Sequence, residues 1–245
     1  MKKNKYYLLF SIVIFTFSGC NQFGDLFKNA GPITTEERHL QAIDKIELYN
    51  DVDVVIHHDS IYRMTVTAGS HLLGKIETNF DGNKLIIRNK NKFNWVRKFN
   101  PTLVVDIWVP SISNMMIFNG SGNISCADTL VSPIFELNSY GSLGNYNLIL
   151  NCGASYLKIH NGPADINVSG ITNLSYIYAA GDGKINGENY IADETDITDE
   201  SINDIKIYAN DKLNVTLQSI GNIYYKGAPT QLITKITGSG KLIPL

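Results

Sequence analysis

The chain has 245 residues and a mass of 27.2 kDa, with 44% hydrophobic and 18% charged residues. Enough of it is apolar to form a core, which excludes a wholly disordered chain. Its 21 Lys and Arg residues face 23 Asp and Glu residues. Because no basic surplus is left for phosphate groups, we expect no nucleic-acid partner.

Residues 1–20 read MKKNKYYLLFSIVIFTFSGC, with three lysines, an apolar run and a Ser-Gly-Cys ending. This order is typical of a secretory signal, and the apolar run is too short to span a bilayer. The ending resembles the lipobox of bacterial lipoproteins, although Phe17 stands where that pattern prefers Leu. The sequence therefore predicts a signal peptide over residues 1–19 and acylation of Cys20, for example with palmitate. A plain secretory signal is the alternative.

Residues 20–38 contain Gly, Asn and Pro but no sustained hydrophobic period, which predicts a tether. Lipoproteins that this chain resembles usually go to the outer membrane when the residue after the cysteine is not Asp, and here it is Asn21. We therefore expect the membrane to be a partner, reached through the lipid anchor. The expected location is the outer membrane, on its periplasmic face or at the cell surface.

A repeat of about 20 residues occupies the chain from residue 120 onward. Each copy begins with Gly or Ser, has Asn, Asp or Lys at its fourth position and has a large apolar residue at its fifth. The copies begin at Gly120, Ser142, Gly162, Gly181, Ser201, Ser219 and Gly238. We expect the small residue to permit a sharp corner through unusual dihedral angles, the polar residue to face water and the apolar residue to point inward.

Short β-favouring runs precede most of these corners, and no copy contains a helical period. A coil of about 20 residues predicts an all-β fold in which parallel strands stack about 4.8 Å apart as a solenoid. An antiparallel sandwich with regularly spaced turns is the alternative. It is disfavoured because a sandwich would not need the same small residue at every turn.

A domain is expected over residues 39–245, with less regular initial strands over 39–110 and seven coils over 111–245. The earlier part alternates apolar and polar residues between turn signals such as Asn50-Asp51 and Asp81-Gly82-Asn83. These strands form either the first coils or a sheet packed on the end of the solenoid. One end is expected to be capped, because a terminal coil would otherwise expose the core.

The order of these segments resembles the head GIN domain family, whose members are often lipoproteins described as auto-transporter adhesins. The resemblance covers roughly residues 40–245 and includes Val52-Asp53-Val54-Val55-Ile56, Val105-Asp106-Ile107-Trp108-Val109-Pro110 and Asn119-Gly120-Ser121-Gly122-Asn123-Ile124. It implies a single-stranded right-handed parallel β-helix and a role in adhesion. It implies no catalytic residues and no cofactor.

The acidic stretch over residues 193–204 is the best candidate for a cation site. Six carboxylates lie in its twelve residues, and Asp193, Asp196 and Asp199 are the candidate Ca²⁺ ligands. Its spacing is not that of an EF-hand loop, and a protruding solvated loop is the favoured alternative. No motif of a serine hydrolase or a P-loop is present, so no catalytic residue is predicted.

Residues 90–99 interleave four basic with three aromatic residues. Phe93, Trp95 and Arg97 are the candidate glycan contacts, since aromatic faces beside cations can stack sugars. The favoured alternative is a hairpin that covers the end of the solenoid. Cys126 and Cys152 are expected to be buried free thiols rather than a disulfide, because they occupy different columns of the repeat.

These features predict a non-enzymatic lipoprotein of the cell envelope, acting as an adhesin or as a binding or structural module. Its partner would be a glycan or a cell-surface protein. The alternative is a carbohydrate-active enzyme, a polysaccharide lyase or hydrolase, on the same scaffold. A third possibility is an assembly platform that uses an exposed coil edge.

Overall fold

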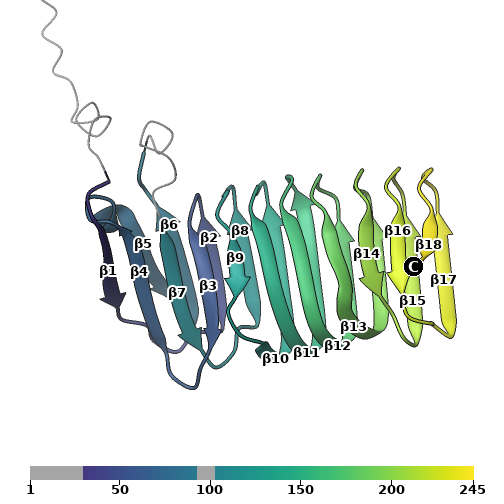
Figure 1. Ribbon diagram of the computed structural model, residues 1–245, viewed down its shortest axis with the longest axis horizontal. Helices are drawn as coiled ribbons and strands as arrows, with labels where there is room; N and C mark the ends of the chain where they lie inside the picture. The colour runs from purple at the N-terminus through teal and green to yellow at the C-terminus, as the bar shows by residue number, and fades with distance from the viewer. Residues whose placement is uncertain (1–29, 93–102) are drawn as a thin grey trace, which may run out of the picture.

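The structure is a computed structural model, and it describes residues 30–92 and 103–245. Its 18 strands are hydrogen-bonded into one continuous system. They lie across the long axis of an elongated molecule (Figure 1). From β8 onward the strands follow one another in chain order, whereas β2 and β3 lie between β6 and β7 on one side and β8 and β9 on the other. The fold is a parallel β-solenoid of about 7 turns with a period of about 20 residues, as the repeat predicts.

Two ladders of strands extend along the solenoid, and we name them face 1 and face 2. Face 1 contains β5 (Ile76–Asp81), β6 (Lys84–Asn89), β2 (Lys45–Tyr49), β8 (Asn114–Phe118), most of β10 (Leu130–Tyr140), the second parts of β11 (Asn145–Asn161), β12 (Asp165–Ala179) and β13 (Ile185–Asp199), then β15 (Lys212–Leu217) and β17 (Gln231–Ile236).

Face 2 is formed by the other strands and by the first parts of the three long ones. It contains β1 (Ile33–Arg38), β4 (Arg63–Gly69), β7 (Val104–Val109), β3 (Asp53–His58), β9 (Ile124–Cys126), the first parts of β11, β12 and β13, then β14 (Ile205–Tyr208), β16 (Ile223–Lys226) and β18 (Leu242–Pro244). A single 3₁₀ turn, η1 (Leu73–Lys75), joins β4 to β5.

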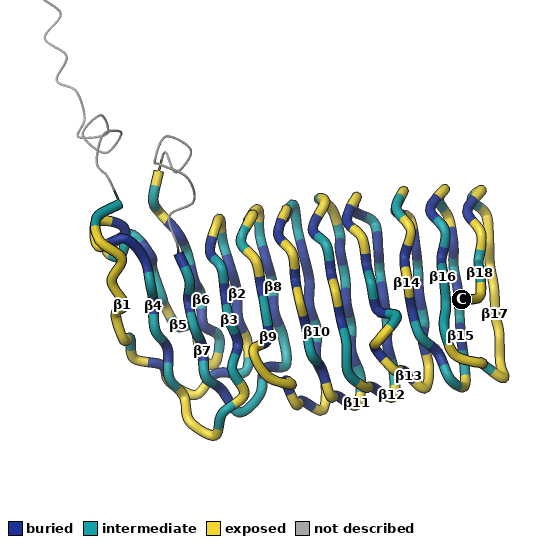
Figure 2. The backbone as a smooth tube through the Cα atoms, in the orientation of Figure 1, coloured by how far each residue is buried: buried dark blue, intermediate teal, exposed yellow. Residues whose placement is uncertain are grey.

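Each complete coil consists of two strand segments that meet at a bend. In β11 the alternation of buried and outward residues breaks at Gly153, which separates the segment in face 2 from the segment in face 1. The register with β12 covers residues 145–152 and then 154–159, so identical positions of successive coils lie side by side. Figure 2 shows the resulting alternation of buried and exposed positions along the strands.

The apolar fifth position of the repeat points into the core, as predicted. Its residues in the first six copies are 0 or 1% exposed, namely Ile124, Tyr146, Ile166, Ile185, Ile205 and Ile223. In a parallel ladder each of them stacks on its equivalent in the next coil. The core is therefore a set of columns that continue along the solenoid rather than a single cluster.

The corners need small residues mainly because successive coils approach closely there. Among the glycines that begin a copy, only Gly162 has a positive φ, of 87°. At Gly181 and Gly183 a Cβ atom would instead lie 2.3 Å and 1.7 Å from backbone oxygens of the preceding coil. Such distances are far below any real contact. The expected reason, unusual dihedral angles, is therefore correct for Gly162 and wrong for the other three.

The polar fourth position does face water, but its side chains also join the coils. In four copies, and in Asp53 before them, a side-chain oxygen accepts a hydrogen bond from the backbone N–H of the next stacked corner. The pairs are Asp53 with Asn123 (2.7 Å), Asn123 with Asn145 (3.1 Å), Asp165 with Lys184 (2.7 Å), Asp204 with Asn222 (2.9 Å) and Asn222 with Lys241 (3.0 Å). This corner ladder explains the preference for Asn and Asp.

The two ends of the solenoid are built differently. At the N-terminal end, β2, β3 and β6 to β9 take part in parallel ladders, while β1, β4 and β5 add antiparallel pairings. The initial strands therefore continue the ladders of the solenoid, with antiparallel pairings at its outer end. At the other end β17 pairs with β15 alone among the described strands, and all six of its residues are exposed.

Candidate binding surfaces

A row of neighbouring rings crosses the outer surface of face 1, and all but its last pair are stacked. It takes one ring from each of five successive coils, and we call it the ring row. Its members are Tyr49, Phe118, Tyr140, His160 and Tyr178, with centroid separations in that order of 5.0, 5.1, 4.3 and 5.6 Å. The Arg88 guanidinium lies 4.4 Å from the centroid of the Tyr49 ring and extends the row by one strand.

The inner rings of the row stack nearly parallel, so their faces are covered and their edges point outward. The interplanar angles are 7° for Phe118 with Tyr140 and 1° for Tyr140 with His160. Burial lowers the pKa of His160, and the charge of Lys158 lowers it further. At neutral pH the His160 ring is therefore uncharged, and it stacks without the cost of a partly buried cation.

Two lysines beside the ring row are paired with glutamates. Lys84 Nζ lies 2.7 Å from Glu47 Oε2, and Lys158 Nζ lies 2.6 Å from Glu136 Oε1. Burial alone would raise the pKa of Glu136, but the hydrogen bonds that it accepts, above all from Lys158, hold that pKa below its usual value. These two ion pairs neutralise the carboxylates beside the rings, while Arg88 adds a cation at one end of the row.

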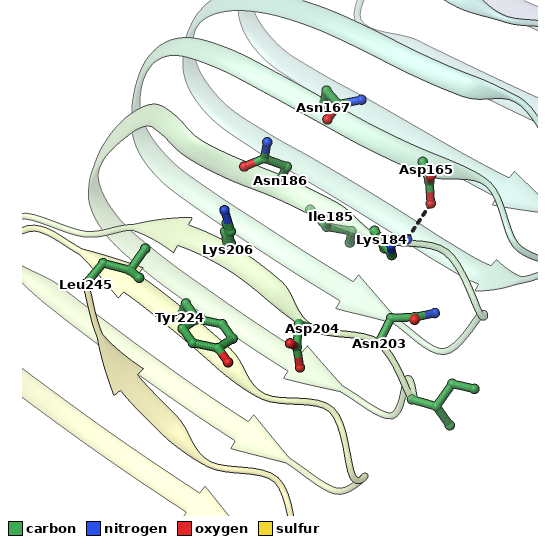
Figure 3. Close-up of a pocket in the computed structure, with 11 residues that line it drawn as sticks. Asp165, Asn167, Lys184, Ile185, Asn186, Asn203, Asp204, Lys206, Tyr224 and Leu245 are labelled. Carbon is green, nitrogen blue, oxygen red and sulfur yellow. Dashed lines mark hydrogen bonds between the residues drawn. The ribbon is translucent and has the colours of Figure 1, made fainter.

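A groove of about 780 Å³ lies on the outer surface of face 2, over β12, β13, β14 and β16 (Figure 3). Its walls include the corner before β14, with Ile202 and Asn203, and the chain beside β16, with Leu245. Polar side chains dominate the lining. They are Asp165, Asn167, Lys184, Asn186, Asn203, Asp204, Lys206 and Tyr224.

Two carboxylates in the groove belong to the corner ladder. Asp165 Oδ1 accepts from the Lys184 N–H at 2.7 Å, the dashed line in Figure 3. Asp204 Oδ1 accepts from the N–H of Asn222 at 2.9 Å and from its side-chain amide at 3.2 Å. Because these carboxylates hold the next coil in place, they are positioned by the scaffold and not aimed at a reacting bond.

A family model described as "Putative auto-transporter adhesin, head GIN domain" matches residues 42–229. The chain belongs to this family. The match confirms the resemblance found in the sequence, and the family's description supports an adhesin-like, non-enzymatic role at the cell envelope or surface.

Solved structures share the fold. A "putative adhesin" from Bacteroides fragilis is 16% identical, with a TM-score of 0.81 over 87% of this chain and 97% of that one. A "putative lipid binding protein" from Parabacteroides distasonis is 20% identical, with a TM-score of 0.66 over 88% and 97%. A "putative adhesin" from Parabacteroides merdae is 17% identical, with a TM-score of 0.64 over 89% and 98%. No curated protein matches the chain.

The three candidate Ca²⁺ ligands do not converge. Asp193 is exposed at the bend of its coil, Asp196 faces outward on face 1 and hydrogen-bonds Asn214, and Asp199 points into the core. Within residues 30–92 and 103–245, no group of three or more His, Cys, Asp and Glu side chains could hold a metal ion. The acidic stretch is mostly one strand, β13, and not a protruding loop.

Four predicted site residues lie outside the described residues, namely Cys20, Phe93, Trp95 and Arg97. The predicted free thiols are confirmed, since Cys126 and Cys152 are buried and unpaired. Burial raises the pKa of Cys126, and Cys152 Sγ lies 3.1 Å from the Tyr190 hydroxyl. In the described part of the chain, no helix is both long and apolar enough to cross a membrane.

Sequence reasoning overlooked both surfaces, although each has a periodic signal. Phe118, Tyr140 and His160 all stand two residues before the first position of a copy. The groove uses the sixth position, which is Asn167, Asn186, Lys206 and Tyr224 in four successive copies. Extending the alignment by two residues on each side of the five-residue corner would have shown both columns.

Proposed function

We propose that this chain is a non-enzymatic, adhesin-like module of the bacterial cell envelope whose face 1 binds a protein on another cell surface. The observation that carries the proposal is the ring row, which continues across β2, β8, β10, β11 and β12 without interruption. A structural role would be served by the buried columns alone. The rings instead occupy positions that face outward.

The chemistry of the ring row fits a protein partner. Tyrosine and arginine are enriched at the energetic centres of protein interfaces. Tyrosine supplies a large contact area at a low cost in conformational entropy. The inner rings offer edges and polar groups rather than open faces, which suits a flat polypeptide surface better than a sugar. The neighbouring glutamates are already paired with lysines, so a partner does not have to satisfy these four charges.

Anchoring completes the proposal. The lipobox-like sequence that ends at Cys20 supports acylation there, and residues 21–38 would tether the solenoid to the outer membrane. Labelling cells with radioactive palmitate tests this step. Labelled wild-type protein and unlabelled Cys20→Ala are expected, and equal labelling of the two would reject the anchor.

An adhesion assay tests the binding face. The mature chain, immobilised through its C-terminus, should retain bacterial or host cells from the same habitat, and prior protease treatment of those cells should abolish retention. Tyr140→Ala should weaken retention about tenfold or more, the size of effect seen when an aromatic residue at an interface centre is truncated. Tyr208→Ala, an outward tyrosine on face 2, is the matched control and should retain cells normally.

Retention that is unchanged in Tyr140→Ala would reject the ring row as the contact surface, provided that the circular dichroism spectrum shows the variant to be folded. Retention that survives protease treatment of the cells would reject a protein partner. No observation on the described residues favours the carbohydrate-active enzyme over this proposal. The groove carboxylates Asp165 and Asp204 hold backbone N–H groups, and Asp199 lies inside the core.

A further inference from the structure

We infer that the groove on face 2 is a second binding site, for a linear glycan built of neutral sugars. The inference is independent of the ring row, because the groove lies on the other face of the solenoid. It rests on the kinds of side chain that line the groove, on their spacing and on their net charge.

The groove offers the hydrogen-bonding groups that sugar hydroxyls require. A hydroxyl both donates and accepts, and a side-chain amide provides both functions at one position. Asn167 donates from its nitrogen to Asn147 at 3.2 Å, which leaves its oxygen to accept. Asn186 accepts from the Glu188 N–H at a long 3.5 Å and has no partner for its amide nitrogen among the described residues. The two amides therefore present one free acceptor and one free donor.

The spacing of these groups matches a polymer that lies along the solenoid axis. Asn167 pairs in register with Asn186, Asn186 with Lys206, and Lys206 with Tyr224. Neighbouring strands are about 4.8 Å apart, which is close to the length of one pyranose ring in a linear chain. Each sugar of such a chain can therefore meet the equivalent position of the next coil.

An aromatic platform ends the groove. The Tyr224 ring lies beside Leu245, and its hydroxyl points toward the side where Asp204 lies (Figure 3). Tyr224 is partly exposed, and no hydrogen bond, ion pair or ring contact engages its side chain within residues 30–92 and 103–245. The C–H face of a sugar can pack on such a ring while the hydroxyl group hydrogen-bonds to the sugar.

The charges of the lining select the class of glycan. Two carboxylates, Asp165 and Asp204, face two ammonium groups, Lys184 and Lys206, so the lining has no net charge. Lys206 is in addition 3.5 Å from Glu188, which shares its charge with Lys226 at 3.6 Å. An acidic polymer would bring carboxylates toward Asp165 and Asp204 without a surplus of cations to offset them. A neutral chain avoids that repulsion.

Isothermal titration calorimetry on the mature chain tests the inference. The probes are four neutral hexasaccharides, from cellulose, laminarin, mannan and xylan, and one acidic probe, hexagalacturonate. At least one neutral probe should bind, and more tightly than the acidic one. Tyr224→Ala should weaken its binding about tenfold, and Asn186→Ala should weaken it about threefold. Tyr176→Ala, a tyrosine that faces outward on face 1, is the matched control and should bind like the wild type.

Three results would overturn the inference. These are no binding of any neutral hexasaccharide, tighter binding of hexagalacturonate, or equal losses in Tyr224→Ala and Tyr176→Ala. The adhesion assay separates this failure from that of the proposed function. If the protein retains cells through the ring row yet binds no hexasaccharide, only the inference of a glycan site fails. If it binds a hexasaccharide yet retains no cells, only the proposed adhesive role fails.

Discussion

Asp165 and Asn186 both line the groove on face 2, yet the fold uses them in opposite ways. The Asp165 carboxylate sits in a corner and accepts the backbone N–H of Lys184 at 2.7 Å. The Asn186 amide sits on a strand, and among the described residues it makes one hydrogen bond, a long contact of 3.5 Å from the Glu188 N–H. The Asp165 side chain holds the next coil, whereas the Asn186 side chain is free to meet a ligand. A solenoid can therefore change its partner without changing its architecture.

The largest loss of stability is expected when a corner glycine is replaced. In Gly183→Ala the new Cβ would meet the Ala164 oxygen, which lies 1.7 Å from the place that it must occupy. The backbones of two coils would have to separate, and we expect a loss of about 3 kcal/mol or more in the free energy of unfolding.

Urea denaturation of Gly183→Ala measures this loss. The control is Gly74→Ala, because a Cβ at Gly74 meets no atom within 4 Å. Equal stability of the two variants would mean that the corners do not stack as closely as described.

A smaller effect is expected from the corner ladder. Asp165→Ala removes the acceptor of the Lys184 N–H, and we expect a loss of about 1 kcal/mol, as when other backbone donors lose a side-chain cap. Asp165→Asn keeps an oxygen at the same place and should recover most of that loss. Thermal unfolding of both variants distinguishes the hydrogen bond from the charge, because a purely electrostatic role would make them equally unstable.

Asp199 extends the comparison to the inner side of a strand. It is fully buried, Oδ1 accepts from the Ser201 N–H at 2.8 Å, and Oδ2 has no hydrogen-bond partner in the described structure. Burial raises its pKa above 3.8, although the hydrogen bonds from Ser201 lower it in part. The native state thus keeps the proton at pH values where the unfolded chain has released it. The contribution of Asp199 to the free energy of unfolding is therefore complete below pH 3.8 and is lost as the pH rises through the native pKa.

Asp199→Asn should therefore be more stable than the wild type at neutral pH. Its free energy of unfolding should also fall less steeply as the pH rises above 3.8. Urea denaturation at a series of pH values measures both effects. Asp193→Asn, which removes an exposed carboxylate from the same coil, serves as the control. If the free energy of unfolding of Asp199→Asn falls with pH as steeply as that of the wild type, the pH dependence arises from other groups.

The smallest effect on stability is expected at an outward strand position. Asn186→Ala should change the free energy of unfolding by less than about 0.5 kcal/mol, as surface substitutions usually do. The same polar-to-alanine change at residue 165 should cost at least twice as much. If Asn186→Ala proves as destabilising as Asp165→Ala, the outward side chain of Asn186 also stabilises the solenoid. The contrast between corner and strand positions then fails.

The repeat made most of the fold predictable because stacking imposes the same demand on every coil. The fifth position had to be apolar from Ile124 to Leu242, and that regularity identifies both the coil length and the inward face. The reason for the small residues was harder to predict. A glycine that needs a positive φ, such as Gly162, and one that needs space beside another coil, such as Gly183, look alike in a sequence.

The binding surfaces could be predicted only in part, since they depend on register across coils. The rings of Phe118 and Tyr140 are 22 residues apart, but the sequence does not say whether they face each other or the core. The shape of the groove also depends on where Leu245 lies. The backbone N–H of Leu245 donates a hydrogen bond to the backbone carbonyl oxygen of Tyr225 at 2.9 Å. Local periodicity contains no information about that contact.

The corner ladder has a direction. In every pair the oxygen belongs to the earlier coil and the N–H to the later one, from Asp53 with Asn123 to Asn222 with Lys241. A coil that is already folded therefore displays acceptors that the following stretch of chain can use as soon as it arrives. In these pairs the template lies always on the N-terminal side, so from β8 onward coils can be added one at a time in the order in which a polypeptide is synthesised.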